Sequence, residues 1–492
     1  MRNVATDTDV LIVGAGPVGL FLANECARRG LGWRLIEARS TQSLHSKALA
    51  IFPRTLEIFD MAGVVDPFLA VANRVVSVAV VTHGRPLAHM RFEPRESPYQ
   101  FVAMVPQDVT EKLLAEELRR RGGSPEYETT FVAAEQRDDR VVATVERRGE
   151  TAVQRASFVV GCDGAHSTVR HQLNIPFEGA AYDATYILAD VETNEALPAD
   201  ELQLCPSEFG PVAIFPMSAI RRRIVATVDH REGDAPSLDL VRRILAQRAP
   251  RKLEARALHW STYFTIHHRR VARLRAGRIF IAGDAAHIHS PFGGQGMNTG
   301  LHDAWNLAWK LDLMLHGYGN ERLLDSYGTE RLPIIEHVIH TTDVLTKVLG
   351  TPNRFAQALR DAVIPMVSRL APFQHAFVQR LSELGIAYRG SPIVEGPGER
   401  YFDDSVRGGK GIQSRFLLVL GNDAEASTVQ AAKQLAESCA DVLELRFAPR
   451  HGITLVRPDG YAAYTTRRRD GLAALATLRS VLERQMAVAV PA

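Results

Sequence analysis

A short glycine-rich turn near the start of the chain has the residue types and spacing that hold a dinucleotide. Residues 14–19 read Gly-Ala-Gly-Pro-Val-Gly, directly after an apolar, β-branched run from Val10 to Val13. In such a turn Gly14 permits a tight bend, Gly16 lets the backbone approach a pyrophosphate, and Gly19 allows close packing of helix on strand. The helix that follows offers unpaired N–H groups and a partial positive charge to the phosphates.

An acidic residue stands where the ribose of a bound dinucleotide would need an acceptor. Glu37 ends a second expected strand, Trp33 to Ile36, and lies 23 positions after Gly14. A carboxylate at that place accepts hydrogen bonds from ribose hydroxyls. Strand, turn, helix and strand together predict a dinucleotide-binding unit; the alternative is a plain glycine-rich turn with a surface glutamate. The motif alone does not distinguish FAD from NAD.

Two further glycine- and aspartate-bearing segments lie far along the chain. The first, residues 159–170, reads VVGCDGAHSTVR and places Asp163 after an expected strand. The second begins GRIFIAGDAAH at residues 277–287, with Asp284 after a buried strand, and continues PFGGQGMN at residues 291–298, where a helix is expected to begin. Glycines in that last run leave room for a close approach to the backbone, which a plain helix cap would not need.

Taken in order, the three segments resemble the fingerprints of the group A flavoprotein aromatic hydroxylases, the family typified by para-hydroxybenzoate hydroxylase. The resemblance runs from about residue 8 to 345, and the tail, with LVRPDGY at 455–461, is similar to phenol and polyketide hydroxylases that carry a thioredoxin-like C-terminal domain. It implies an α/β fold: a Rossmann-like FAD-binding domain, an inserted antiparallel-sheet substrate domain, and a small C-terminal thioredoxin-like α/β domain.

The resemblance also implies a bound FAD and the residues that contact it. Asp284 would hydrogen-bond the ribityl chain, and the backbone N–H groups of Met297 and Asn298 would face the pyrimidine edge. A helix N-terminus there stabilises the negative charge of the reduced ring. The residues assigned to the cofactor are Gly14, Gly16, Pro17, Gly19, Glu37, Arg39, Lys47, Gln107, Asp163, Asp284, Pro291, Gly294, Gly296, Met297 and Asn298.

Several of these assignments have a structural alternative. Gln107 follows Pro106 and matches a family glutamine near the ribityl or phosphate region, and its alternative is an ordinary residue at a helix N-terminus. Arg39 has the alternative of a solvated surface arginine, and Asp163 that of a structural Asp-Gly turn. Lys47 stands where many relatives have a basic residue, often arginine, near the pyrophosphate, and it keeps the charge without the bidentate fork.

The activity that the resemblance implies is that of a flavin-dependent monooxygenase. NADPH or NADH would bind transiently and reduce the FAD. The chain has no second Rossmann fingerprint, which fits a family in which the nicotinamide donor binds without a domain of its own. Dioxygen as co-substrate would then give a C4a-hydroperoxyflavin that hydroxylates a small aromatic substrate of phenolic or polyketide type. Two alternatives stay open: an FAD-dependent epoxidase or Baeyer–Villiger-type oxygenase on a polyketide, and a non-catalytic flavin-binding protein.

The substrate pocket is predicted from position alone. Its wall is expected to include Phe215, Pro216 and Phe292. A base or acceptor near a phenol hydroxyl would help the ring to react, but no residue is assigned as catalytic, because each candidate has only its position in its favour. The candidates are His287, His289, Tyr263, His267 and Arg222.

The elements that must position these residues can be outlined from hydrophobic periodicity. Runs between residues 186 and 228 predict a mostly antiparallel sheet, two strands are expected between Asn73 and Met104, and residues 299–349 predict helices with a break at Gly317 to Gly319. The tail is expected to contain strands Phe416–Leu420 and Ile453–Val456 and helices Thr428–Cys439 and Gly471–Arg484. The expected domains are an FAD-binding domain (1–75, 105–182 and 270–345), a substrate sheet (76–104 and 183–269), a helical connection (346–395) and a C-terminal domain without CxxC (396–492).

Composition excludes several classes of function. Lys and Arg total 58 against 56 Asp and Glu, a net charge of +2, which gives no support to a nucleic-acid surface. No apolar run reaches membrane-spanning length, and the polar N-terminus lacks the apolar stretch of a signal peptide. The four cysteines are scattered, which predicts reduced thiols in a cytoplasmic protein and no metal site. A monomer or homodimer is expected.

Overall fold

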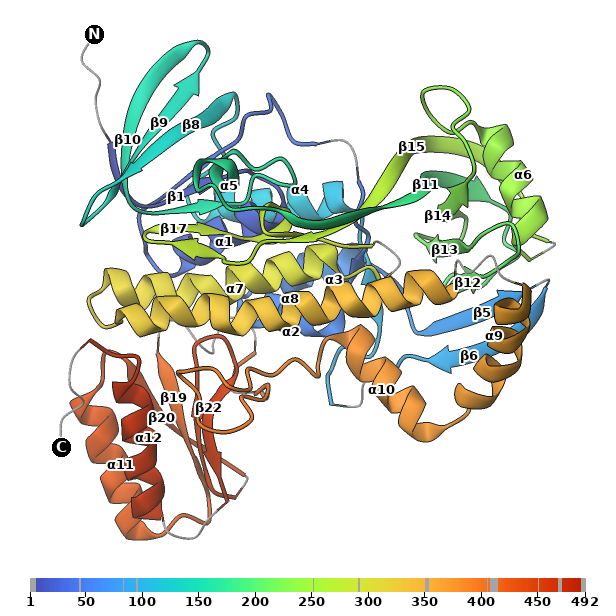
Figure 1. Ribbon diagram of the computed structural model, residues 1–492. Coiled ribbons are helices and arrows are strands. Elements are labelled where there is room, and N and C mark those ends of the chain that lie inside the picture. Colours follow the sequence, from blue (N-terminus) through green and yellow to red (C-terminus); the bar gives the residue numbers. More distant parts are fainter. Residues whose placement is uncertain are drawn as a thin grey trace.

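The computed structural model describes residues 6–43, 46–82, 84–93, 96–250, 252–290, 293–349, 354–404, 406–407, 415–449, 451–467 and 471–487. A central pair of long helices separates two sheets on one side from a smaller sheet on the other (Figure 1). This is the α/β architecture expected from the sequence.

The first sheet carries the N-terminal βαβ unit. Four of its strands are parallel and run in the order β17-β10-β1-β2, so that segments more than 100 residues apart become neighbours. The carboxyl ends of parallel strands share one edge of a sheet. This strand order therefore brings the glycine-rich turn after β1 and the 159–170 segment at the end of β10 to the same edge. The strands are β1 (Thr6–Val13), β2 (Trp33–Ile36), β8 (Thr129–Gln136), β9 (Val141–Arg147), β10 (Glu150–Gly161), β16 (Arg275–Ala276) and β17 (Ile279–Ile281).

The second sheet has eight strands in the order β18-β15-β11-β14-β13-β12-β5-β6 and is antiparallel except where β12 pairs with β5. The prediction of a mostly antiparallel sheet is confirmed. One face of the sheet packs on helix α6 (Leu238–Arg248). The other face packs on a buried cluster that includes Ala50, Phe52, Val102 and Met104. The strands are β5 (Ser77–Thr82), β6 (Arg85–Arg91), β11 (Glu178–Thr193), β12 (Glu201–Cys205), β13 (Val212–Pro216), β14 (Arg221–Val228), β15 (Ala255–Arg270) and β18 (His287–Ile288).

The expectation of two strands between Asn73 and Met104 is wrong. The segment contains four strands, and two of them join a separate three-stranded sheet in the order β3-β7-β4. These pieces are only two or three residues long, too short for a periodicity of two to be visible. They are β3 (Ala50–Ile51), β4 (Asn73–Val75) and β7 (Val102–Met104).

Helices α7 (Gly296–Leu315) and α8 (Glu321–Leu349) run side by side through the middle of the molecule (Figure 1). They are separated at the predicted break: Gly317 has φ +77°, and the N–H groups of Tyr318 and Gly319 both bond to the carbonyl of Leu313. The other helices before the tail are α1 (Pro17–Arg28), α2 (Pro53–Met61), α3 (Val65–Val71), α4 (Gln107–Arg120), α5 (Thr168–Gln172), α9 (Arg354–Val367) and α10 (Ala371–Ser382).

The C-terminal unit is a mixed four-stranded sheet in the order β20-β19-β21-β22, as expected of a thioredoxin-like domain. Strands β20 and β22 were not expected, because both lie at the edges of the sheet and polar residues interrupt their apolar pattern. Its elements are β19 (Phe416–Gly421), α11 (Ala426–Ser438), β20 (Leu443–Ala448), β21 (Ile453–Val456), β22 (Ala462–Thr466) and α12 (Gly471–Glu483). Among the described residues, no helix has the length and apolar character that a bilayer crossing needs.

Cys439 lies half-buried at the end of α11, and its thiol is free, as are those of the other three cysteines. We expect Cys439→Ser to leave turnover unchanged, because serine keeps the size of the side chain and the domain has no second cysteine to pair with it. Steady-state consumption of NADPH with substrate present would check this. A collapse of activity would show that the thiol takes part in the reaction.

Candidate functional site

The glycine-rich turn between β1 and α1 is packed at its first and third glycines and open at its second. Gly14 has φ +102°, and a Cβ atom on it would lie 2.5 Å from the carbonyl oxygen of Cys162. A Cβ atom on Gly19 would lie 1.9 Å from the carbonyl oxygen of Gly14, whereas Gly16 has no atom within 4 Å of its Cβ position. The protein needs the outer two glycines for its own packing, and the space beside Gly16 is left for a ligand.

Glu37 lies beside this turn and is fixed there by hydrogen bonds. Its Oε2 accepts from the backbone N–H of Ala15 at 2.8 Å, and its Oε1 accepts from the backbone N–H and Nε of Arg39 at 3.0 and 2.9 Å. Burial raises the pKa of Glu37, but the hydrogen bonds from Arg39 and Ala15 outweigh burial, and the pKa lies below its ordinary value. The carboxylate is therefore charged at the edge of the turn, and Arg39 is paired with it.

The middle segment, at the end of β10, supports the turn that carries Asp284. The carboxylate of Asp163 accepts hydrogen bonds from Ser167 Oγ at 2.5 Å and from the backbone N–H of Val169 at 3.2 Å, which is what a structural Asp-Gly turn requires. Arg170 donates to the carbonyl oxygen of Ala285 at 2.9 Å. The segment thus ties the end of β10 to the residue after Asp284.

A buried aspartate outside the recognised motifs holds the same turn from the other side. Asp303 on α7 accepts from the backbone N–H of Gly283 at 3.1 Å and from Arg331 Nε at 2.7 Å, and it pairs with His287 Nε2 at 2.7 Å. Burial alone would raise its pKa, but the charges of Arg331 and His287 hold the pKa at about 2. Nothing in the local sequence distinguishes Asp303 from a surface acid on a helix.

Asp284 itself lies on the 3₁₀ turn η1 (Gly283–Ala285) and is solvent-exposed. Protein nevertheless surrounds the carboxyl closely enough for desolvation to raise its pKa, with partial compensation from His287 and Lys47. The exposed Lys47 lies close enough to Asp284 to influence its carboxyl electrostatically.

The start of α7 is anchored so that its backbone N–H groups stay available. The side chain of Asn298 is buried, donating to the carbonyl oxygen of Ala50 at 2.9 Å and accepting from the N–H of Phe52 at 3.0 Å. The first helical hydrogen bond runs from the N–H of Thr299 to the carbonyl oxygen of Gln295. The N–H groups before it, including that of the buried Met297, precede this bond and form the positive end of the helix.

The starts of α1 and α7 meet at a contact made of small residues. A Cβ atom on Gly283 would lie 2.8 Å from Cγ2 of Val18, and one on Gly300 would lie 2.7 Å from the same atom and 3.0 Å from the Cα of Gly283. Two helix N-termini and the Asp284 turn therefore converge on one place. Such an arrangement suits a long ligand that places a pyrophosphate at one helix N-terminus and an anionic ring at the other.

Comparison with known proteins agrees with this geometry. A family model described as an FAD binding domain matches residues 7–342. The chain belongs to this family. It is 34% identical to 6-methylpretetramide 4-monooxygenase of Streptomyces rimosus over 412 residues, which cover 81% of this chain and 73% of that one. It is 31% identical to 12-dehydrotetracycline 5-monooxygenase/anhydrotetracycline 6-monooxygenase of Streptomyces rimosus subsp. rimosus, covering 93% of this chain and 95% of that one.

The structure resembles OxyS anhydrotetracycline hydroxylase from Streptomyces rimosus with a TM-score of 0.78 and 28% identity, over 98% of this chain and all of that one. The chain is accordingly an FAD-dependent monooxygenase, which uses NAD(P)H and O2 to hydroxylate an aromatic substrate. The family expected from the three segments is confirmed. Bound FAD supplies the redox and oxygen-transfer chemistry, and the protein's part is to bind, orient and exclude water.

Replacing Asp284 by alanine in this monooxygenase is expected to weaken FAD retention by roughly tenfold or more, the effect of losing charge-assisted hydrogen bonds of about 1.4 kcal/mol. The fold should survive, because Asp284 is exposed and the turn is held by Asp303 and Arg170. The FAD content of the purified protein, read from its absorption spectrum, measures the effect. Unaltered flavin content would contradict the role of this carboxyl.

Gln107 and a glutamate that the sequence did not reveal lie together at the start of α4. Gln107 Nε2 donates to Glu111 Oε1 at 3.0 Å, and its Oε1 accepts from the N–H of Ala48 at 3.2 Å. Glu111 is buried, its Oε2 accepts no hydrogen bond from the part of the chain that the structure describes, and desolvation raises its pKa to about 7. The Gln107 side chain therefore links Glu111 to the segment that carries Lys47, and nothing in the spacing of the sequence pointed to Glu111.

The residues predicted to form the wall of the substrate pocket do not all lie on the same face of the sheet. Phe215 is buried in an apolar cluster with Ala50 and Phe52, whereas strand alternation turns Pro216 to the opposite face of β13. Pro291 and Phe292 lie outside the described residues. Among the described residues, no group of three or more His, Cys, Asp or Glu is arranged to hold a metal ion.

The loop of residues 293–296 at the start of α7, which is expected to face the flavin, is called the flavin-facing loop below. Of the five side chains considered for substrate activation, His289 lies against this loop: its Cε1 and Nε2 would each lie 3.6 Å from a Cβ atom on Gly296. Its Nε2 is buried and has no hydrogen-bond partner among the described residues, and desolvation lowers its pKa to about 4, which keeps the ring neutral at ordinary pH. His287 is engaged with Asp303. Arg222 donates to the carbonyl of Leu197, Tyr263 to that of Glu232, and His267 lies on β15 opposite Ala181.

Proposed function

We propose that this monooxygenase hydroxylates a fused-ring phenolic substrate of polyketide type, held between the start of α7 and the apolar face of the eight-stranded sheet. The observation that carries the proposal is a continuous apolar cluster from the flavin-facing loop to that sheet. A Cβ atom on Gly294 would lie 3.4 Å from Cβ of Ala50 and 3.5 Å from the ring of Phe52. Both residues belong to the buried cluster that contains Phe215 and Tyr186 of the sheet.

The size and character of this wall support a flat, apolar substrate. Tyr186 and Phe264 place their rings 5.6 Å apart on neighbouring strands, and Trp260 and Met217 are half-buried beside the same cluster. Aromatic side chains give a fused ring system a large contact area with defined geometry. The names of the relatives fit this proposal, since 6-methylpretetramide and anhydrotetracycline stand in two of them.

We further propose that FAD extends from Glu37 and Arg39, past Gly16, Asp284 and Lys47, to the first turn of α7. The carboxylate of Glu37 supports this direction, because it is charged and fixed beside the glycine turn. The contacts assigned to the cofactor are those of Gly14, Gly16, Pro17, Gly19, Glu37, Arg39, Lys47, Gln107, Asp163, Asp284, Pro291, Gly294, Gly296, Met297 and Asn298.

We also propose the four-part division at residues 75, 104, 182, 269, 345 and 395, a cytoplasmic location, and a monomer or homodimer. Long strands β11 and β15 cross from the FAD-binding part into the substrate sheet, so the two parts should unfold together. Light scattering on the purified protein would decide the oligomeric state. A single cooperative unfolding transition for residues 1–345 would support the coupling of the first two parts.

The test of the proposed substrate class is a screen of simple phenols and polyketide aromatics for stimulated NADPH consumption, with product mass and structure recorded. We expect a fused-ring phenol to stimulate consumption and to gain one oxygen atom with its carbon skeleton and unsaturation intact. A ring-expanded ester or an epoxide as product would favour the Baeyer–Villiger or epoxidase alternative. If no aromatic compound raised consumption above the basal rate, the proposal would fail.

A further inference from the structure

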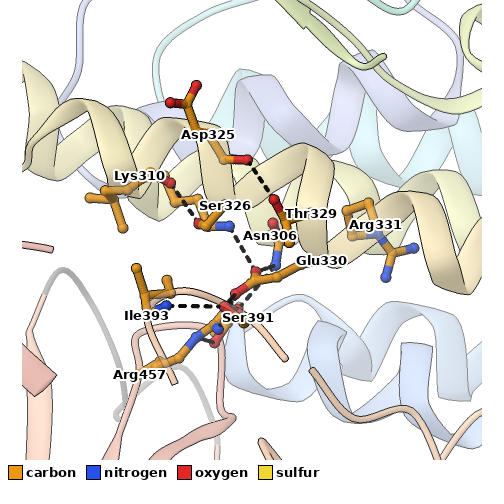
Figure 2. A network of polar contacts seen from close by, with 12 residues as sticks. Asn306, Lys310, Asp325, Ser326, Thr329, Glu330, Arg331, Ser391, Ile393 and Arg457 are labelled. Carbon is orange, nitrogen blue, oxygen red and sulfur yellow. Dashed lines mark hydrogen bonds and ion pairs between the residues drawn. The ribbon is translucent and has the colours of Figure 1, made fainter. Parts of the chain in front are cut away.

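A buried cluster of charged side chains lies on the far side of α7 from the cofactor site. Figure 2 shows Asn306 of α7, Ser391 of the linker after α10 and Arg457 of the C-terminal domain gathered around Glu330 of α8. Glu330 Oε2 accepts from Lys310 Nζ and Asn306 Nδ2, each at 2.8 Å, while its Oε1 accepts from Ser391 Oγ at 2.6 Å and from Arg457 Nη1 at 2.5 Å. The side chains of Glu330, Lys310 and Arg457 are completely buried.

Arg457 belongs to a five-residue turn, Arg457 to Tyr461, between β21 and β22. The N–H of Arg457 bonds to the carbonyl of Tyr461, and the N–H of Gly460 bonds to the carbonyl of Arg457. The guanidinium also pairs with Asp459, at 3.1 Å from Nε to Oδ1, and lies 5.2 Å from the ring centre of Trp309 and 4.8 Å from that of Tyr388. The two cations Lys310 and Arg457 balance the two anions Glu330 and Asp459. Because a buried charge must stay close to its partner, these pairs fix the position of the turn relative to α7 and α8.

The same turn contacts both α2 and α7, the two helices that meet at the flavin-facing loop. The carbonyl oxygen of Asp459 accepts from Trp305 Nε1 of α7 at 2.9 Å and from Arg54 Nη2 of α2 at 3.3 Å. Tyr461 accepts from Arg54 Nε through its hydroxyl at 3.3 Å, and the Arg54 guanidinium lies 4.6 Å from its ring centre. The turn therefore joins α2 to α7.

Asn298 joins the same two elements at the cofactor side. Its side chain bonds to Ala50 and Phe52, and Phe52 is the residue that caps α2, two positions before Arg54. Trp305 follows Asn298 by seven residues, roughly 10 Å along the helix at 1.5 Å per residue. The segment of α7 from Asn298 to Trp305 is thus held against α2 at both of its ends. Asn298 holds it beside the flavin-facing loop, and the Arg457–Tyr461 turn holds it at Trp305.

We propose that the Arg457–Tyr461 turn is a positioning element of the cofactor site, through which the C-terminal domain sets the place of the first turn of α7. Arg457, Asp459 and Tyr461 are positioning residues, since they act through Trp305 and Arg54. The inference rests on the proposed contact between FAD and the start of α7. It gives the C-terminal domain a part in the reaction although the domain carries no paired cysteines.

Trp305→Phe and Tyr461→Phe, singly and together, test the inference, because each removes one hydrogen bond and keeps an aromatic ring in place. Hydrogen exchange at the amides of residues 299–305 is measured first, in FAD-free protein. We expect the double variant to exchange there roughly tenfold faster, to bind FAD roughly three- to tenfold more weakly, and to shift the midpoint potential of bound FAD to a more negative value. The potential shifts because moving the positive helix end away costs the reduced, anionic ring more stabilisation than it costs the oxidised, neutral ring.

Leu478→Ala is the matched control. Leu478 on α12 is buried in the apolar cluster of the C-terminal domain and has no polar side-chain atom, so its truncation should lower the melting temperature while leaving all three quantities as in the wild type. The inference is overturned if the double variant behaves as the wild type in all three, or if Leu478→Ala changes them equally. Because exchange and FAD binding need no substrate, this outcome is independent of the substrate screen that tests the proposed function.

Discussion

Gly16→Val is expected to abolish FAD binding while the apoprotein keeps its fold. Apart from its chain neighbours, no described residue has an atom within 4 Å of the Cβ position of Gly16, so the branch point of the added isopropyl group has room in the ligand-free protein. Gly16 has φ −75°, which valine adopts without strain. The side chain would fill the space that the pyrophosphate needs beside the helix N-terminus, and we expect FAD affinity to fall by roughly 100-fold or more, about 2.7 kcal/mol.

Quenching of FAD fluorescence measures the affinity, and circular dichroism during heating measures the apoprotein. The free energy of unfolding should change by at most about 1 kcal/mol, the usual effect of replacing a glycine helix cap by an apolar residue. Gly328→Ala, at another open glycine in the first third of α8, serves as control and should bind FAD normally. Normal FAD binding by Gly16→Val would show that the phosphates lie elsewhere.

Asp303→Ala is expected to be the most destabilising single change at the site. Its carboxylate is fully buried and bonds to Gly283, His287 and Arg331, so its removal leaves the buried Arg331 guanidinium without a counter-charge. Breaking a buried pair in this way costs about 3–5 kcal/mol, a large share of the roughly 5–15 kcal/mol that stabilises a typical protein. FAD retention should also fall, because the Asp284 turn loses one of its two anchors.

Urea unfolding of Asp303→Ala, Arg331→Met and the double variant measures this effect. In the double variant the unpaired charge is gone, and we expect the loss of stability to be smaller than the sum of the two single losses. If Asp303→Ala lowered the free energy of unfolding by less than about 1 kcal/mol, the buried pair could not be what holds the turn.

The sequence was most informative where a local steric requirement fixes the residue type. Gly14 and Gly19 are required by carbonyl oxygens at 2.5 and 1.9 Å from their Cβ positions, and a requirement of this kind leaves a readable motif. The break at Gly317, with its positive φ, was predictable for the same reason. The parallel pairing of β1 with β2 likewise follows from the βαβ pattern at the start of the chain.

The residues that the sequence could not reveal act through partners far along the chain. Asp303 and Glu330 stand within helices, where an acid usually indicates a solvated face, and both are buried by Arg331 and Arg457. Asp163 illustrates a partial success: the motif located it, but its hydrogen bonds to Ser167 and Val169 support the structural alternative. Side-chain pairing depends on helix packing and register, which the local pattern does not encode.

Titration of FAD into the apoprotein, followed by the quenching of flavin fluorescence, tests most directly whether the separate glycine-rich segments form one cofactor site. The account predicts saturable binding to the wild type, with the affinity lost in Gly16→Val and reduced in Asp284→Ala, two residues that lie 268 positions apart in the chain. Wild-type protein that quenches no FAD fluorescence, or variants at both positions that bind as the wild type does, would contradict it.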